Sequence, residues 1–205
     1  MPATLAAGLR PLSAGQSQLV FRAVLDALAR PGTIHQLPAA GGAQPVPPAL
    51  MPMLALADLS TTVCVLADDP SLAPAVRAAT LAPVAGLAHA QLVAVLRALE
   101  DGELGQLRTG TAAAPEHGAL ACLSVRSLRP GTAGGQGPDG QVLRLAGPGV
   151  PGARELRVAG LPPDFVAGRR RLVASFPAGA DLLMVAPGGE LAGLPRTTLI
   201  SEEMA

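Results

Sequence analysis

The chain has 205 residues, which is enough to bury a hydrophobic core, and we expect it to form a single domain over residues 1–205. Its formal net charge is zero, so it lacks the basic excess that a nucleic-acid partner would require, and it has no Trp or Tyr on which bases could stack. The basic residues are all arginines. Without a lysine, the chain alone can build neither a Walker-type phosphate loop nor a Schiff-base enzyme.

The sequence also lacks the features of a membrane or secreted protein. No apolar run approaches the ~18 residues that a membrane span needs, and the N-terminus is a poor signal peptide because it has no long apolar core. We therefore expect a soluble, cytoplasmic protein. Cys64 and Cys122 lie in apolar segments and are predicted to be buried free thiols, not a disulfide or a metal site.

The first predicted element is a helix with recognisable ends. Residues 13–16 have the spacing of a capping box, and apolar residues then recur at helical spacing over residues 21–28. The Pro-Gly pair at 31–32 ends the helix. On another face Arg22 and Asp26 lie one turn apart, which predicts an exposed ion pair.

Short strands and helices are expected to alternate through the middle of the chain. Apolar or β-branched runs predict strands over residues 33–37 and 61–66. Helices are expected over residues 49–58 and from 71 to about 79. Residues 90–96 suit both a helix and a strand, and their composition does not decide between the two.

Two further strands flank a segment rich in Gly and Pro. Residues 119–128 and 141–145 are predicted to be strands that pair as a hairpin. The residues between them, 129–140, are expected to form a mobile loop. A short strand at 155–158 and a helix from 162 to about 175 should follow.

The last predicted element is a hairpin near the C-terminus, after a helix whose arginines 169–171 are interpreted as a solvated face. Its strands are the apolar residues 182–185 and 191–194, and the turn between them is Pro-Gly-Gly at 187–189. Residues 196–198 then place a guanidinium and two hydroxyls in a row, an arrangement that suits a phosphate or a carboxylate. We expect the chain to end in a short polar tail.

These elements predict an α/β protein with a mixed β-sheet and flanking helices. The candidate ligand-binding or interface residues lie in polar turns, where Arg, Thr and Gly either bind an anion or cap strands and form turns. They are Arg108, Thr109, Thr111, Glu116, Arg144, Gly147, Gly149, Asp181, Arg196, Thr197 and Thr198.

We predict no catalytic residue and no metal site. The histidines at 35, 89 and 117 share no metal-ligand spacing with one another or with a cysteine. No serine has the sequence context of a nucleophile elbow. Glu116 with His117 is the only pair that suggests acid–base chemistry, and such a pair is usually exposed on the surface without a catalytic role.

The same turns, taken in order, resemble one protein family over nearly the whole chain. The segments that carry the resemblance are Phe21–Leu28, Pro31–Ile34, Gly110-Thr111, Pro115-Glu116, Arg144-Leu145, Gly147–Gly149, Phe176-Pro177, Gly179, Asp181–Leu183 and Pro195–Thr198. In this order and spacing the sequence resembles PhnH, the H subunit of the bacterial carbon–phosphorus lyase core complex of phosphonate metabolism.

The resemblance implies a fold like that of the pyridoxal-phosphate-dependent transferases, without the cofactor. The missing lysine agrees, because an internal aldimine needs a lysine amine. It further implies a homodimer in isolation and assembly with subunits of the G, I and J types. Together these subunits transfer a phosphonate onto the ribose of ATP and displace adenine, which yields ribose 1-methylphosphonate 5-triphosphate. The resemblance also favours a strand for residues 90–96.

On this resemblance we expect an accessory subunit in organic phosphonate catabolism, with the nucleosidase chemistry in the I subunit. Arg196 would be the main anion partner, Thr197 and Thr198 hydroxyl donors, and Arg108 and Arg144 secondary charges. Strand capping and dimer packing are the alternative roles for all of them.

Glu116 and Asp181 are expected to orient these arginines and not to act as acid or base. Two other interpretations stay open at this point. One is a free-standing enzyme or binder acting on a phosphorylated metabolite through Glu116 and His117. The other is a pure assembly scaffold.

Overall fold

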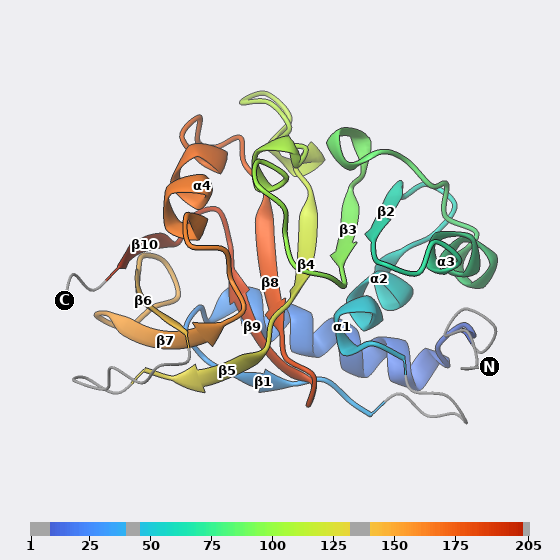
Figure 1. The fold of residues 1–205 in the computed structure, drawn as a ribbon, viewed down its shortest axis with the longest axis horizontal. Coiled ribbons are helices and arrows are strands. Elements are labelled where there is room, and N and C mark those ends of the chain that lie inside the picture. Colours follow the sequence, from blue (N-terminus) through green and yellow to red (C-terminus); the bar gives the residue numbers. More distant parts are fainter. Residues whose placement is uncertain (1–8, 40–45, 132–139, 203–205) are drawn as a thin grey trace.

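A computed structural model describes residues 9–39, 46–131 and 140–202. Two β-sheets form the centre of the fold (Figure 1). The larger sheet has the strand order β1-β9-β8-β4-β3-β2, in which β2, β3, β4 and β8 run parallel and β9 and β1 antiparallel to their neighbours. Its strands are β1 (His35–Gln36), β2 (Val63–Leu66), β3 (Leu92–Val95), β4 (Leu120–Ser124), β8 (Asp181–Val185) and β9 (Glu190–Leu194).

The smaller sheet is wholly antiparallel, in the order β10-β6-β7-β5. Its strands are β5 (Ser127–Pro130), β6 (Gln141–Ala146), β7 (Arg154–Ala159) and β10 (Leu199–Glu202). Helices surround the two sheets, and none of those described is long and apolar enough to cross a bilayer. The α-helices are α1 (Ala14–Ala29), α2 (Met51–Leu56), α3 (Leu72–Thr80) and α4 (Phe165–Leu172).

Alternation along the central strands divides the core into two layers. On β8, Leu183 and Val185 face a cluster that includes the buried side of α1, while Leu182 and Met184 face α4 and the smaller sheet. All four are at most 1% exposed. Because the larger sheet is covered on both faces, the sequences of its inner strands are continuous apolar runs. The mixed α/β architecture expected from the sequence is confirmed.

Local signals in the sequence located α1 correctly, and the strand that the family resemblance favours for residues 90–96 is confirmed. The predicted capping box is present, since the Ser13 hydroxyl accepts from the Gln16 backbone N–H and the Gln16 side chain accepts from the Ser13 N–H. The expected partner of Asp26 is wrong, because its carboxylate pairs with Arg30 at 2.6 Å instead of with Arg22. The ambiguous residues 90–96 contain strand β3, whose residues are all buried between β2 and β4.

The predicted hairpin between residues 119–128 and 141–145 is wrong. The first segment is two strands, β4 in the larger sheet and β5 in the smaller one, and β5 pairs with β7 instead of β6. β4 is covered on both faces, whereas the next residues carry exposed arginines that need a solvent face, so the chain must change sheets there. The Gly-rich segment expected at 129–140 begins within β5, and its residues 132–139 lie outside the described part of the chain.

The expected polar tail is also wrong, because residues 199–202 form β10 and pair with β6. Ile200 is the reason: its side chain is buried in the core that the smaller sheet shares with β8 and α4. The C-terminal hairpin itself is confirmed, with β8 and β9 antiparallel and the turn at residues 186–189.

The packing of α1 on β9 depends on one glycine. A Cβ atom at Gly193 would lie 2.5 Å from the carbonyl oxygen of Ala27 and 2.9 Å from the backbone nitrogen of Leu28. Backbone atoms cannot move aside as a flexible side chain can, so any larger residue there must push α1 off the sheet.

We expect Gly193→Ala to lower the free energy of unfolding by about 2–3 kcal/mol, because overpacking at a rigid contact shifts the backbone. Gly15→Ala is the matched control. Gly15 lies in α1 with nothing near its missing Cβ, so this change should leave stability unchanged or raise it by up to about 1 kcal/mol. Urea denaturation of both variants measures the difference, and equal stabilities would contradict the contact.

Candidate functional site

The polar turns nearest one another lie at the amino edge of the parallel strands. Because β8 and β9 are antiparallel, the start of β8 and the end of β9 meet at the same edge, with Leu182 opposite Leu194. The start of β4 lies beside them, with Leu120 opposite Asp181. The connections that precede β4 and follow β9 therefore come together here (Figure 1).

An ion pair between Asp181 and Arg196 is the centre of this edge. The Nη2 of Arg196 donates to Oδ2 of Asp181 at 2.7 Å, and Nε donates to Oδ1 at 3.2 Å. The backbone N–H of Arg196 adds a third bond to Oδ1 at 2.7 Å. Both side chains are largely buried, so removing one partner would leave the other charge without its partner away from water, which is costly.

The remaining donor of Arg196 holds the loop before β4. Its Nη1 donates to the carbonyl oxygen of Pro115 at 2.6 Å and, at 3.4 Å, to that of Pro177. The guanidinium also lies against Gly118, where a Cβ atom would come within 3.0 Å of both Nη atoms. Arg196 is thus committed to contacts inside the chain, which favours the capping role over the role of main anion partner.

A second buried arginine lies behind this pair, and the sequence interpretation missed it. Arg169 on α4 is 1% exposed, whereas Arg170 and Arg171 are exposed, so the three do not form one solvated face as expected. Helical spacing explains the difference, since Arg169 is one turn after Phe165 and one turn before Leu172, both in the core. The spacing of Arg169 from these two apolar residues could have predicted from the sequence that its side chain is buried.

Arg169 is only partly satisfied. Its Nη2 donates to the carbonyl oxygen of Pro195 at 2.9 Å, while its Nε and Nη1 have no partner among the described residues. Burial lowers the pKa of the guanidinium to about 10; the nearby Asp181 opposes this shift and Arg196 adds to it. Asp181 is thus the counter-charge of Arg196 and also the carboxylate whose charge acts on Arg169.

A depression of about 510 Å³ opens beside this cluster, and it contains several of the predicted site residues. Arg108 makes no side-chain hydrogen bond or ion pair with another described residue, and the Thr111 hydroxyl accepts from the Ala114 N–H at 3.1 Å, which leaves its proton free to donate. The lining is Ala88, Gly105, Gln106, Leu107, Arg108, Thr109, Gly110, Thr111 and His117. We call this depression the polar pocket.

The polar pocket is anchored to the buried cluster through backbone bonds. The carbonyl oxygen of Thr109 accepts from the Gly179 N–H at 2.7 Å, and Thr109 forms a bridge with Gly118. Ala119 donates to the carbonyl oxygen of Arg108 at 2.7 Å. A guanidinium, hydroxyls and an imidazole around one depression are groups that bind phosphate or phosphonate oxygens.

The other predicted site residues do not join the polar pocket. Arg144 lies in the middle of β6 in the smaller sheet, exposed and opposite Glu155 on β7. Glu116 is exposed and makes no described side-chain contact with an arginine, so the proposed orienting role falls to Asp181 alone. The three predicted arginines thus lie in three different places: Arg108 in the polar pocket, Arg144 on the smaller sheet and Arg196 in the ion pair with Asp181.

The glycines and threonines near β6 and β10 have structural surroundings. Gly147 and Gly149 have φ of 124° and 78°, and Gly147 lies against the carbonyl oxygen of Thr197. Thr197 is exposed, while Thr198 is 2% exposed and its hydroxyl has no partner among the described residues. These residues join the smaller sheet to the Arg196 turn.

Metal-ligating side chains do not gather among the described residues. These residues contain no group of three His, Cys, Asp or Glu side chains that could hold a metal ion. The sequence has no lysine that could form an aldimine with pyridoxal phosphate. Both cysteines are buried free thiols as predicted, and burial raises the pKa of Cys122 to about 12, which keeps it protonated.

Comparison with known proteins identifies the family. The family described as bacterial phosphonate metabolism protein (PhnH) matches residues 12–201. The chain belongs to the PhnH family. A relative from Stutzerimonas stutzeri, which carries the provisional name C-P lyase subunit protein HtxG, is 34% identical over 198 residues. The alignment covers 95% of this chain and 91% of the relative.

The shared carboxylate makes Asp181 the most costly residue of the cluster to remove. We expect Asp181→Asn to lower the free energy of unfolding by about 3–5 kcal/mol, because both buried guanidiniums lose their counter-charge. Asp26→Asn, which breaks an exposed helical ion pair with Arg30, should cost no more than about 0.5 kcal/mol. Urea denaturation at neutral pH checks both, and similar losses would show that the cluster does not hold the fold.

Proposed function

We propose that this PhnH-family chain is an accessory subunit of a cytoplasmic carbon–phosphorus lyase core complex. In this role it supports the transferase step that makes ribose 1-methylphosphonate 5-triphosphate from ATP and an alkylphosphonate. Its partners are subunits of the G, I and J types, and it is a homodimer when isolated. The observation that carries the proposal is the 34% identity, over almost the full length of both chains, to a relative provisionally named as a C-P lyase subunit.

The polar pocket supports a contact with a phosphorylated or phosphonate ligand. Arg108 supplies an uncommitted charge, the Thr111 hydroxyl has a proton free to donate, and His117 supplies an imidazole beside them. The same residues give no reason to place bond-breaking chemistry in this chain. No hydrogen bond joins Glu116 to His117 in the described part of the chain, so the one candidate acid–base pair is not formed. We propose that the subunit works without pyridoxal phosphate and leaves the chemistry to a partner.

Reconstitution tests the proposal directly. The G-, I- and J-type subunits of the same organism are purified with and without this chain and supplied with ATP and methylphosphonate. We expect the triphosphate product, followed by ³¹P NMR, to form at least about tenfold faster when the chain is present, the scale of a lost positioning interaction. Equal rates, or failure of the tagged chain to retain the other subunits on co-expression, would overturn the proposal.

His117 keeps one alternative function open, because its side chain lines the polar pocket. A free-standing enzyme would turn over ATP or a phosphorylated sugar on its own, and His117→Ala would abolish that turnover. Turnover by the isolated chain with this sensitivity would favour the enzyme over the accessory subunit.

Arg108 tests the ligand contact within the proposed function. We expect Arg108→Ala in the isolated chain to weaken binding of methylphosphonate or ATP by about tenfold, since a charge-assisted hydrogen bond is lost. Arg126→Ala is the control, because Arg126 is exposed and lies outside the polar pocket. Isothermal titration calorimetry measures both variants. Equal affinities, or no binding by the unaltered chain, would leave the pocket without the proposed role.

A further inference from the structure

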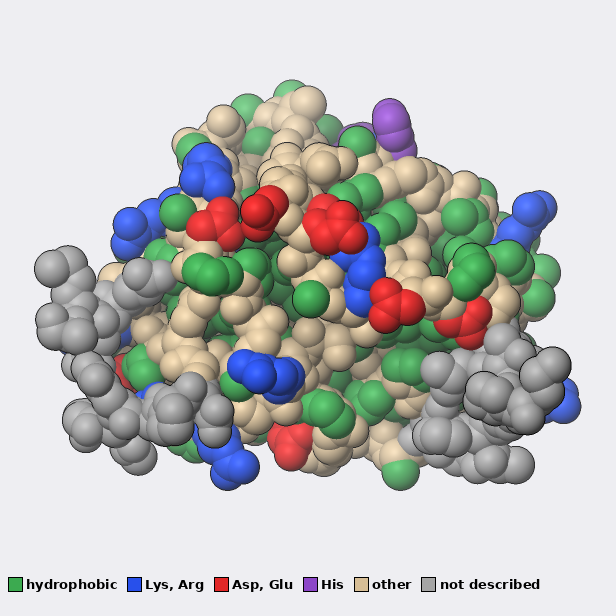
Figure 2. Space-filling model, in the orientation of Figure 1, with side chains coloured by type: hydrophobic (Ala, Val, Ile, Leu, Met, Phe, Trp, Pro, Cys, Tyr) green, Lys and Arg blue, Asp and Glu red, His purple; other side chains and the backbone are tan. Residues whose placement is uncertain are grey.

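A second depression, of about 650 Å³, lies beside α3 at the β2 edge of the larger sheet. Figure 2 shows hydrophobic side chains gathered at that end of the molecule. Leu59, Leu81 and Val84 are 73%, 63% and 47% exposed there, although each is a large apolar side chain. We call this depression, lined by Leu59, Ala73, Pro74, Arg77, Ala78, Leu81 and Val84, the apolar groove.

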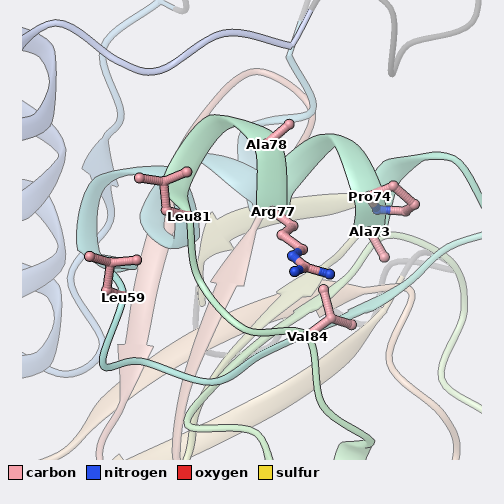
Figure 3. Close-up of a pocket in the computed structure, with 7 residues that line it drawn as sticks. All are labelled: Leu59, Ala73, Pro74, Arg77, Ala78, Leu81 and Val84. Atoms are coloured by element: carbon pink, nitrogen blue, oxygen red, sulfur yellow. The ribbon is translucent and has the colours of Figure 1, made fainter.

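The outer face of α3 forms one wall of the apolar groove. Pro74, Arg77, Ala78 and Leu81 recur at helical spacing, while Leu72 and Val76 turn toward the core. In Figure 3 the Arg77 side chain extends from α3 toward Val84, with Leu59 and Leu81 at one end of the groove. Small alanines between these side chains leave room for another chain to approach closely.

The backbone of Leu81 is in an unfavourable conformation, and the burial of its side chain within this chain does not compensate for it. Its φ is 63°, in the left-handed region where Gly or Asn normally ends a helix. A leucine in this conformation is strained, and here most of its side chain is also left in water. Contact with another molecule would bury that side chain and give the residue a favourable role.

Arg77 gives the apolar groove its charge. It is the only charged residue in the lining, and it makes no side-chain hydrogen bond or ion pair with another described residue. Asp58, next to Leu59 in the lining, accepts from Ser60 and Thr61 in its own turn, and Asp69, before α3, accepts from the Ser71 backbone N–H. A ligand for this surface must therefore be apolar and must bring a carboxylate to Arg77.

We infer that the apolar groove is the docking surface for a segment of another subunit of the complex, with apolar side chains against Leu59, Leu81 and Val84 and one carboxylate on Arg77. This inference rests on the proposed function, because it requires a multi-subunit assembly. The chemistry of the surface matches the helix-in-groove mode of recognition, in which apolar anchors supply affinity and a charge fixes the register.

Leu81→Asn separates docking from folding. Asn tolerates the left-handed conformation, so we expect the variant to unfold at the same or a higher temperature than the unaltered chain. Its retention of the co-expressed G-, I- and J-type subunits should nevertheless fall by about tenfold or more, the loss typical of an interface anchor. Arg77→Glu should give a similar loss, because it places two carboxylates together. Leu25→Asn, at an exposed leucine on α1, is the matched control and should keep the partners.

The outcomes distinguish this inference from the proposed function. If the unaltered chain retains its partners and both groove variants do so equally well, the groove is not the docking surface, although the subunit role stands. If the unaltered chain retains no partner, the subunit role itself fails. If the groove variants keep the partners but change the isolated chain from dimer to monomer in light scattering, the groove binds a second copy and the inference is wrong.

Discussion

The arrangement of the amino edge depends on the buried ion pair between Asp181 and Arg196. One carboxylate fixes the guanidinium through two side-chain bonds, and the remaining donor of that guanidinium reaches back to the carbonyl of Pro115. The loop before β4 thereby acquires its position from residues that follow it far along the chain. Since that loop lines the polar pocket, the shape of the pocket is a consequence of the ion pair.

The carboxylate of Asp181 also has to balance part of the charge of Arg169. A buried guanidinium with two donors unpaired among the described residues destabilises the fold unless a counter-charge lies near, and Asp181 is the carboxylate that acts on it. A hydrophobic residue of similar size would fill the same space on α4 at less cost. Stability alone therefore does not explain the arginine, whose one described bond holds the Pro195 carbonyl next to Arg196.

The sequence predicts well those features that depend on residues close together along the chain, such as helix caps and tight turns. The Ser13 capping box and the Pro-Gly-Gly turn at 187–189 are local, and both are present as expected. Residues whose role depends on distant partners were harder to interpret. The sequence around Arg196 suits an anion, but in the fold Asp181 and Pro115 take its donors. The division of residues 119–128 between two sheets likewise depends on distant partners, β8 for β4 and β7 for β5.

The two surfaces are joined by a short piece of chain, which bears on how an accessory subunit could act. Leu81 and Val84 line the apolar groove, and Ala88, just after them, lines the polar pocket. The connection between them is held to β2 by hydrogen bonds on both sides of Val84, from Val63 to Pro83 and from Ala85 to Val63. A partner seated in the groove would thus contact the same rigid segment that borders the pocket. Docking in the apolar groove would therefore bring the partner next to the segment that borders the polar pocket.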